Sequence, residues 1–191
     1  MHNKKLVGGW FAAVSLLLFS FVAPAFAQDA TLPKPQGDVI LTIDGNIGAT
    51  NGDGVADFDL AMLEALKSAK IRTSTPWFDN AVEFEGALLS EVMALVKADG
   101  DELVVTALND YQAPVPIADF AEYGAILAYK RDGNYMPISD KGPLFIIYPY
   151  DSDPKLNTQK YFSRSVWQVR RFTVREASDR PCPCRTRRQE K

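Results

Sequence analysis

The stretch LVVTAL occupies positions 103–108 of the chain and is followed by the turn residues Asn109 and Asp110. An unbroken run of apolar and β-branched residues that is closed by Asn and Asp is typical of a buried strand. Two later stretches have a similar character, AILAY at 125–129 and LFIIY at 144–148, and VWQVRRFTV at 166–174 alternates as a final strand. The Asp-Gly-Asn turn at 132–134 predicts a hairpin that leads into residues 135–138. The second half of the chain is therefore expected to be mainly sheet.

The first half carries helical patterns instead. Apolar residues recur at mostly helical spacing between Asp57 and Lys67, and again over residues 88–96. Residues 38–43 (DVILTI) are a strand candidate. Residues 73–77 are expected to be extended or looped, because a residue before proline avoids the helical region. Two early helices and at least five strands predict a fold of the α+β class.

The N-terminus has the order of a cleavable secretion signal. Lys4 and Lys5 precede an apolar run at 6–22, and Ala-Phe-Ala at 25–27 supplies the small residues that signal peptidase needs. A retained membrane anchor is the alternative, because the apolar run is only a little shorter than a bilayer span.

We expect cleavage after residue 27, so that residues 1–27 are a signal peptide and residues 28–37 a polar lead. The processed chain is not expected to span a membrane, since nothing later is long and apolar enough. The lysine pair, without an Arg-Arg pair, indicates the Sec-type route for unfolded chains. The sequence therefore predicts a periplasmic protein.

Charge and residue content restrict the chemistry of the mature chain. The net charge of −3 understates the acidity of the body, because the leader and the tail are basic. An acidic body argues against nucleic acid as a partner. His2 is the single histidine, and it lies in the leader. The mature chain then lacks the commonest general base and the commonest ligand of transition metals.

The C-terminal segment differs in composition from the body. Residues 175–191 form a basic stretch that we expect to be a disordered tail, which leaves residues 38–174 as the domain. Both cysteines, Cys182 and Cys184, lie in this tail and alternate with prolines. They make a poor zinc site, because structural zinc needs four ligands and no other Cys or His remains in the mature chain. In an oxidising compartment they are free to pair with a partner or to oxidise.

A glycine-rich turn before the first helix has some features of a calcium loop. Asn51, Asp53 and Asp57 would supply oxygen ligands at three positions of such a loop. Ala49 and Leu60 stand where the first ligand and the final bidentate carboxylate belong. An ordinary turn is therefore the preferred interpretation.

Polar and aromatic residues also gather at the ends of the expected strands. They are residues 109–111 (Asn-Asp-Tyr), residues 140–142 (Asp-Lys-Gly), and Arg164 with Trp167. Functional sites are commonly built in such places, and so are solvated turns. Spacing alone leaves both interpretations open.

A set of short motifs runs through the chain in a characteristic order. The first set is FEGALL at 84–89, TALNDY at 106–111, VPI at 115–117, ILA at 126–128, DG at 132–133 and KGPL at 141–144. A second set is FDL at 58–60, TPW at 75–77, YP at 148–149 and SVWQ at 165–168. The first set resembles the molybdopterin-binding domain of sulfite oxidase-like proteins. The second resembles an exported bacterial branch of it, described as molybdopterin-binding oxidoreductase-like. The resemblance covers residues 39–174 and implies the mixed-sheet α+β fold of that superfamily.

The chain departs from this family at the metal ligand. The resemblance implies a molybdenum-binding cysteine between the first helix and residues 84–89, and the corresponding interval at 71–78 (IRTSTPWF) contains none. A hydroxyl is a harder ligand than a thiol and loses its proton less readily. The resemblance also implies basic residues for the pterin phosphate, and only Arg72, Lys141 and Arg164 are candidates. The resemblance further implies that the pterin is inserted in the cytoplasm and that the folded protein is exported by the twin-arginine route, so the Sec-type leader argues against a pterin as well.

These observations predict a non-catalytic periplasmic binding or sensory accessory domain that uses the superfamily's pocket without metal or cofactor. The residues expected to line it are Thr75, Trp77, Asn109, Tyr111, Lys141 and Arg164. The aromatic rings would give flat apolar contact, and the lysine and arginine would hold an anionic group. The expected partner is a small anionic molecule or a periplasmic or membrane sensor protein. The alternatives are a molybdopterin-dependent oxidoreductase with non-cysteine metal ligation and a purely structural interaction module.

Overall fold

The computed structural model describes residues 30–177. The expected signal peptide, the first residues of the polar lead and the expected tail beyond residue 177 lie outside this part, so nothing is said of their structure. In the part that is described, no helix combines the length and the apolar character that a membrane crossing requires.

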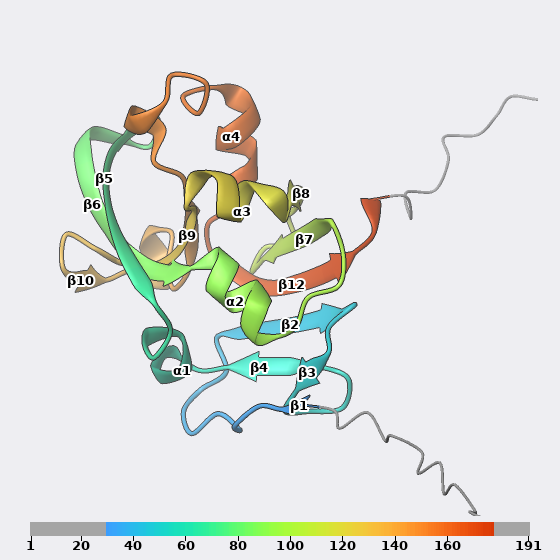
Figure 1. Ribbon diagram of the computed structural model, residues 1–191. Helices are drawn as coiled ribbons and strands as arrows, with labels where there is room; N and C mark the ends of the chain where they lie inside the picture. The colour runs from blue at the N-terminus through green and yellow to red at the C-terminus, as the bar shows by residue number, and fades with distance from the viewer. Residues whose placement is uncertain (1–29, 178–191) are drawn as a thin grey trace, which may run out of the picture.

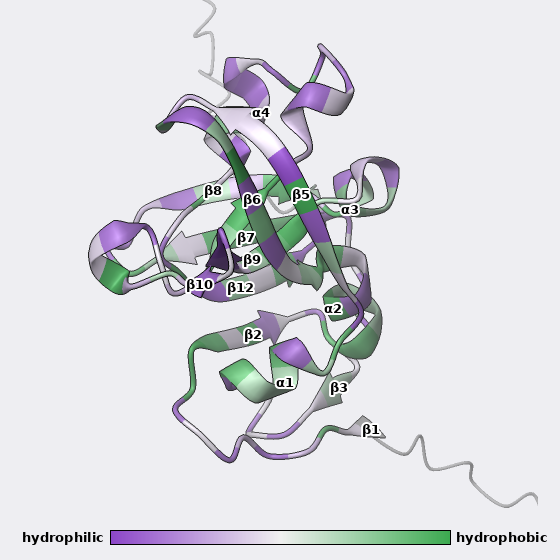
Figure 2. Cartoon of the chain, turned by 90° about the vertical axis from the view of Figure 1, so that its left-hand side faces the viewer, coloured by the Kyte–Doolittle hydropathy of each residue, from purple (hydrophilic) through white to green (hydrophobic). Residues whose placement is uncertain are grey.

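One five-stranded sheet is built around the stretch LVVTAL. Its strands, in spatial order, are β4 (Ala56–Phe58), β2 (Leu41–Gly45), β12 (Val169–Arg175), β7 (Glu102–Ala107) and β8 (Gln112–Pro116). Strand β12 runs parallel to β2 and antiparallel to β7, so the sheet is mixed. Strand β7 lies inside the sheet, and residues of both its faces are buried (102, 103 and 105–107), which explains its nearly unbroken apolar sequence. Figure 2 shows this strand largely in green at the centre of the fold.

The outer edge of this sheet is strand β8. Its residues Pro114 and Pro116 pair in register with Val104 and Glu102 of β7. The residues that alternate with these prolines, Ala113 and Val115, are buried. Proline has no N–H to donate, so it is tolerated where the backbone nitrogen faces away from the neighbouring strand.

The second five-stranded sheet contains a hairpin that the sequence did not predict. In this sheet β10 (Asn134–Tyr135), β9 (Ile126–Arg131), β6 (Phe78–Leu88) and β5 (Ser68–Thr75) lie in that order, and β11 (Phe145–Ile147) pairs with β9. Figure 1 shows β5 and β6 as a long curved ribbon. The hairpin is polar outside, with Lys70 3.5 Å from Glu83 and 3.2 Å from Glu85. Charged residues have a low propensity for strands, so the strands at residues 68–72 and 78–88 were not predicted from the sequence.

Strands β6 and β9 approach closely at Gly86. A Cβ built there would lie 2.2 Å from the backbone oxygen of Leu127 and 2.5 Å from the Cα of Ala128. The strand register shifts between Glu85 and Gly86. A glycine is therefore required at this irregularity, because any side chain would force the two strands apart.

The helices are short and cover the sheets. They are α1 (Leu60–Glu64), α2 (Leu89–Leu95), α3 (Ala118–Tyr123) and α4 (Gln159–Arg164), with 3-10 turns η1 (Ile138–Asp140) and η2 (Tyr150–Ser152). The two expected early helices are confirmed as α1 and α2, and both are shorter than predicted. Helices α3 and α4 were not predicted. Some strand limits also differ from expectation: the strand expected at 38–43 lies at 41–45, and the last strand begins at 169 rather than 166.

The glycine-rich turn before α1 is closed by its own side chains. The amide nitrogen of Asn51 donates to the backbone oxygens of Pro33 and Asp57, both at 2.8 Å. The backbone nitrogen of Asp57 donates back to Asn51 Oδ1 at 2.8 Å. Within residues 30–177 no group of His, Cys, Asp or Glu side chains is arranged to hold a metal ion. The turn interpretation therefore has a structural basis.

The Asp59 carboxylate is one of the groups that hold the N-terminal segment on the domain. The Asp59 side chain caps α1 through Met62 N at 2.8 Å and accepts from the backbone nitrogens of Gln36 at 2.7 Å and Gly37 at 2.8 Å. These backbone donors, that of Gly37 foremost, lower the pKa of Asp59. Residues 30–31 (β1) also pair in parallel with residues 49–50 (β3).

The core has two parts that meet at one tryptophan. The larger cluster lies between the two sheets and includes Phe58, Tyr148 and Phe172. A smaller cluster around Phe84 and Phe145 involves β6, β9 and β11. Trp77 packs against both clusters. The turn that carries Trp77 is thereby fixed on the sheet, and this is where the candidate site lies.

Candidate functional site

A cavity of about 460 Å³ lies where four segments meet. These are the β5–β6 turn, the β7–β8 turn, helix α4 and the segment that leads into β12. The lining residues are Pro76, Trp77, Ala107, Asn109, Tyr111, Gln159, Phe162, Ser163, Ser165, Val166 and Trp167. Its volume lies within the range of small-molecule sites, roughly 300–1,000 Å³. Most of the lining is apolar or aromatic, and none of it is formally charged.

Trp77 is the centre of an aromatic cluster at this cavity. Its ring centroid lies 5.6 Å from that of Trp167 and 5.9 Å from that of Phe162, with interplanar angles of 75° and 74°. Behind it, the ring of Phe145 lies at 5.2 Å and that of Tyr150 at 6.4 Å. Edge-to-face packing of this kind orients rings as well as burying them. The Trp77 ring therefore has a fixed orientation.

The β7–β8 turn places Asn109 and Tyr111. The Asn109 side chain accepts a hydrogen bond from Tyr111 N at 3.1 Å, which is an Asx-turn contact, and Asp110 between them takes a positive φ of 65°. Arg170 of β12 donates through Nε to Ala107 O at 3.1 Å and forms an ion pair with Asp110. This turn holds the Tyr111 ring at the cavity with half of its surface exposed.

The serine hydroxyl at the back of the cavity is fully engaged. Ser165 Oγ donates to the backbone oxygen of Tyr161 at 2.9 Å and is in hydrogen-bond contact with the Tyr150 hydroxyl. Because the Ser165 proton points to Tyr161, the Tyr150 hydroxyl is the donor of the second bond. Burial raises the pKa of Tyr150, so this proton stays in place at ordinary pH.

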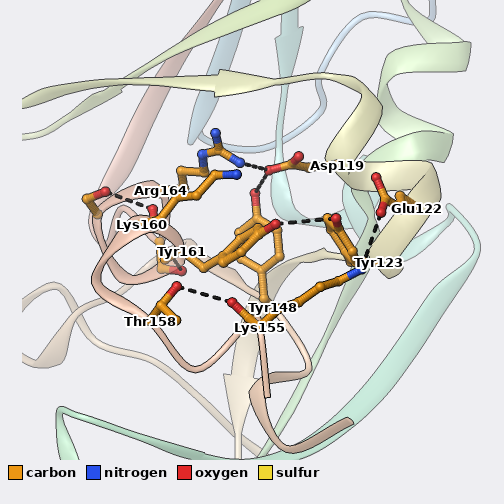
Figure 3. A network of polar contacts seen from close by, with 11 residues as sticks. Asp119, Glu122, Tyr123, Tyr148, Lys155, Thr158, Lys160, Tyr161 and Arg164 are labelled. Carbon is orange, nitrogen blue, oxygen red and sulfur yellow. Dashed lines mark hydrogen bonds and ion pairs between the residues drawn. The ribbon is translucent and has the colours of Figure 1, made fainter. Parts of the chain in front are cut away.

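Arg164, the last residue of α4, is not among the residues that line the cavity. Its side chain is held instead in a network of polar contacts with α3 (Figure 3). Its Nη1 donates to Asp119 Oδ2 at 2.5 Å, and the Tyr148 hydroxyl donates to the same oxygen at 3.0 Å. Burial, with the Asp119 carboxylate, raises the pKa of Tyr148. The Tyr161 hydroxyl donates to that of Tyr123 at 3.3 Å beside this pair. Arg164 therefore attaches α4, one wall of the cavity, to α3.

Lys141 and Thr75 lie near the cavity without lining it. Lys141 Nζ is 5.1 Å from the Phe78 ring centroid, 5.9 Å from that of Trp167 and 4.0 Å from an Asp140 oxygen. Thr75 Oγ1 accepts from Trp77 N at 3.4 Å and so stabilises the turn. Of the six residues expected to form the site, the structure brings Trp77, Asn109 and Tyr111 together in the lining.

Helix α4 contributes residues that the sequence did not indicate. Gln159, Phe162 and Ser163 belong to a helix that carries polar residues on most of its surface and gives a weak periodic signal. Trp167 was noted among the strand-end residues and proves to be part of the lining. In the structure it directly follows the buried Val166 and is itself more than a third exposed. The signal in the sequence that points to this wall is its place among the polar and aromatic residues at the strand ends.

The donor set at the site does not fit molybdenum. Residues 71–78, where a cysteine ligand would be expected, form the end of β5 and the turn. Thr73 in this interval is buried, and its hydroxyl accepts from Asp151 N at 3.1 Å and donates to Ser74 O at 3.3 Å. Ser165 is equally occupied. The hydroxyls of Thr73 and Ser165 are therefore already bonded within the protein, and the lining contains no cysteine.

Comparison with solved structures identifies the type of fold. The chain is similar to the sulfane dehydrogenase SoxCD from Paracoccus pantotrophus, with a TM-score of 0.50 and 14% sequence identity. The match covers 71% of this chain and 37% of the SoxCD chain, so this chain corresponds to little more than a third of that protein. The predicted α+β class and the sulfite oxidase-type fold are confirmed. No family model matches the chain. No curated protein matches it either.

Proposed function

We propose that this chain is an exported, non-catalytic binding domain that receives a small molecule in the Trp77–Trp167 cavity. The observation that carries the proposal is the cavity itself. It has the size of a small-molecule site, its walls are aromatic, and a few neutral polar groups occur among them. A fixed ring such as Trp77 binds at low entropic cost, because it is already oriented before a ligand arrives.

The chemistry of the lining supports binding rather than catalysis. Acid–base or nucleophilic catalysis needs a carboxylate, an imidazole, an amine, a thiol or an activated hydroxyl. The lining offers Tyr111, Ser163 and Ser165 as hydroxyls, and no base contacts them there: Ser163 donates to Lys160 O at 2.8 Å. Ser165 is held by Tyr161 and Tyr150.

The sequence supports the location of this function. The order of charges, apolar residues and small residues over positions 1–27 is that of a Sec-type signal peptide. On that basis we place the protein in the periplasm, where it would act as a ligand-binding or sensory accessory domain.

A molybdopterin-dependent oxidoreductase with non-cysteine ligation is the second candidate, and the fold similarity to SoxCD is the observation that favours it. Two observations argue against this candidate. The hydroxyls of Thr73 and Ser165 are already hydrogen-bonded within the protein, and Arg164 is not among the lining residues. The lining contains no lysine or arginine that could bind an anionic group of the pterin.

Metal and cofactor analysis of the protein purified from the periplasm distinguishes the two candidate functions. We expect elemental analysis to find no stoichiometric molybdenum and cofactor extraction to yield no pterin; either one in stoichiometric amount contradicts the proposal. N-terminal sequencing of the purified chain checks cleavage after residue 27.

Ligand screening by thermal shift tests the cavity directly. Compounds that raise the melting temperature should lose this effect in Tyr111→Ala and Trp167→Ala, because both rings are exposed and lie in the lining. Tyr135→Ala is the matched control, since Tyr135 is equally exposed and lies on β10, outside the lining. Equal shifts in all three variants would place the binding site elsewhere.

A further inference from the structure

We propose that the Trp77–Trp167 cavity selects a positively charged, alkylated ammonium group. This inference rests on the proposed small-molecule function of the same cavity and assigns the class of ligand. It differs from the anionic ligand that the sequence predicted from Lys141 and Arg164.

The arrangement of the rings is the first step. Trp167 and Phe162 stand nearly perpendicular to Trp77, at 75° and 74°, with centroids within 6 Å of it. The three rings come from different segments, and Tyr111 of the β7–β8 turn also lies in the lining. Adjoining ring planes at right angles form the corner of an aromatic box. Such boxes bind quaternary ammonium groups, because the negative ring faces attract the charge while the alkyl groups pack against the rings.

The charges around the cavity are the second step. Three basic side chains near the lining are each paired with a carboxylate: Arg164 with Asp119, Arg170 with Asp110, and Lys141 with Asp140 at 4.0 Å. Asp140 also pairs with Arg131 at 2.6 Å. An anionic ligand would have to compete with these carboxylates for its cation.

One carboxylate near the aromatic cluster lacks a positive partner. Asp151 Oδ2 accepts from Ser74 N at 2.7 Å, and among residues 30–177 no lysine or arginine forms an ion pair with it. Asp151 directly follows Tyr150, whose ring contacts that of Trp77. Asp151 is exposed and lies outside the lining, so its negative charge adds only a screened, longer-range attraction for a cation.

The neutral polar groups would hold the rest of the ligand. In the described part of the chain, neither the side-chain NH₂ of Asn109 nor the amide of Gln159 donates a hydrogen bond. They are free to contact a hydroxyl or carbonyl oxygen attached to the ammonium group.

A pair of probes with the same shape tests the charge selectivity. Choline and its neutral isostere 3,3-dimethylbutan-1-ol differ in a single atom, nitrogen against carbon. Isothermal titration or NMR titration of the mature protein should give choline at least about tenfold tighter binding than the isostere, since a desolvated cation–π contact is worth at least that factor. Benzoate is the anionic probe and should bind more weakly than choline.

Substitutions of Trp167 and Trp77 test whether the preference for choline depends on these aromatic rings. Trp167→Leu should reduce choline affinity while leaving the weak binding of the isostere nearly unchanged, because leucine keeps the apolar contact and removes the π face. Trp77 packs into the core, so Trp77→Phe is used there, and Tyr135→Ala serves as the control. Equal affinity for choline and the isostere, or tighter benzoate binding, overturns the ammonium proposal and leaves the binding function standing. Failure of all three compounds to bind overturns the ammonium proposal alone, because the ligand screen with Tyr111→Ala and Trp167→Ala tests the binding function separately.

Discussion

Arg164 and Asp119 join helix α4 to helix α3 through a hydrogen bond of 2.5 Å between Nη1 and Oδ2, with only 17% and 9% of their side chains exposed. The Tyr148 hydroxyl donates to the same carboxylate oxygen at 3.0 Å. A wall of the cavity is therefore attached to the core by one carboxylate that serves two donors.

Removing that carboxylate should be costly. Asp119→Ala leaves a guanidinium and a buried hydroxyl without their acceptor, and we expect a loss of about 3 kcal/mol in the free energy of unfolding. Urea unfolding followed by fluorescence measures it. The matched control is Glu122→Ala on the same helix, whose contact with Lys155 is exposed and should contribute less than about 1 kcal/mol. Similar losses in both variants would show that the Asp119 network does not stabilise α4.

The Tyr150–Ser165 contact predicts a measurable coupling. Ser165→Ala leaves the buried Tyr150 hydroxyl without its acceptor, which should cost about 1–3 kcal/mol. Tyr150→Phe in the Ser165→Ala background should then cost little further, because the unsatisfied hydroxyl is gone. A double-mutant cycle measures the coupling. Strictly additive losses would mean that the two hydroxyls do not interact.

Asp59 predicts a pH dependence of stability. Its folded-state pKa lies below the ordinary value of 3.8, so its contribution is present above that value and is lost as pH falls toward the folded pKa. Asp59→Asn should therefore be less stable than the parent chain near neutral pH, and the difference should shrink below about pH 4. Urea titrations at several pH values test this, with Asp53→Asn in the exposed turn as control. A difference that stays constant with pH would exclude the charge of Asp59 as its source.

Gly86 predicts a steric requirement at the crossing of β6 and β9. Gly86→Ala places a methyl group 2.2 Å from Leu127 O and should lower the free energy of unfolding by about 2 kcal/mol or more. Gly37→Ala is the matched control, because its nearest atom lies at an ordinary 3.6 Å and its φ is not positive. Thermal unfolding compares the two, and the control should be close to neutral. Equal melting temperatures would show that the strands separate without cost.

Prediction from the sequence succeeded where burial dictates composition. Strand β7 of one sheet and strands β9 and β11 of the other are predicted directly from LVVTAL, AILAY and LFIIY, because interior strands must be apolar throughout. The β5–β6 hairpin was missed because its alternation involves Lys70, Glu83 and Glu85, which pair with one another outside the core. Helix α4 was missed for a related reason: its outward surface is polar, and only two of its residues, Tyr161 and Phe162, are apolar and pack on the core.

The site was predicted in part for a similar physical reason. Asn109 and Tyr111 stand in the turn that follows the strongly patterned strand β7, so their approximate location follows from that strand. Trp77 follows strand β5, which was not predicted, and it was named through the TPW motif at 75–77 instead. Sequence reasoning assigned Lys141 and Arg164 to the ligand because they carry positive charge. Which carboxylate a cation will meet depends on tertiary contacts, and here Asp140 and Asp119 bind these two.

The two prolines of strand β8 bear on how molecules of this protein meet each other. An open sheet edge invites a strand from another chain to add to it, and such addition is a route to aggregation. At Pro114 and Pro116 the outward backbone nitrogen carries no hydrogen, so an incoming strand would find carbonyl oxygens without the alternating donors that a ladder needs. The edge of the sheet that carries the Asn109–Tyr111 turn is thereby protected against self-association, and the turn beside it stays accessible from solvent.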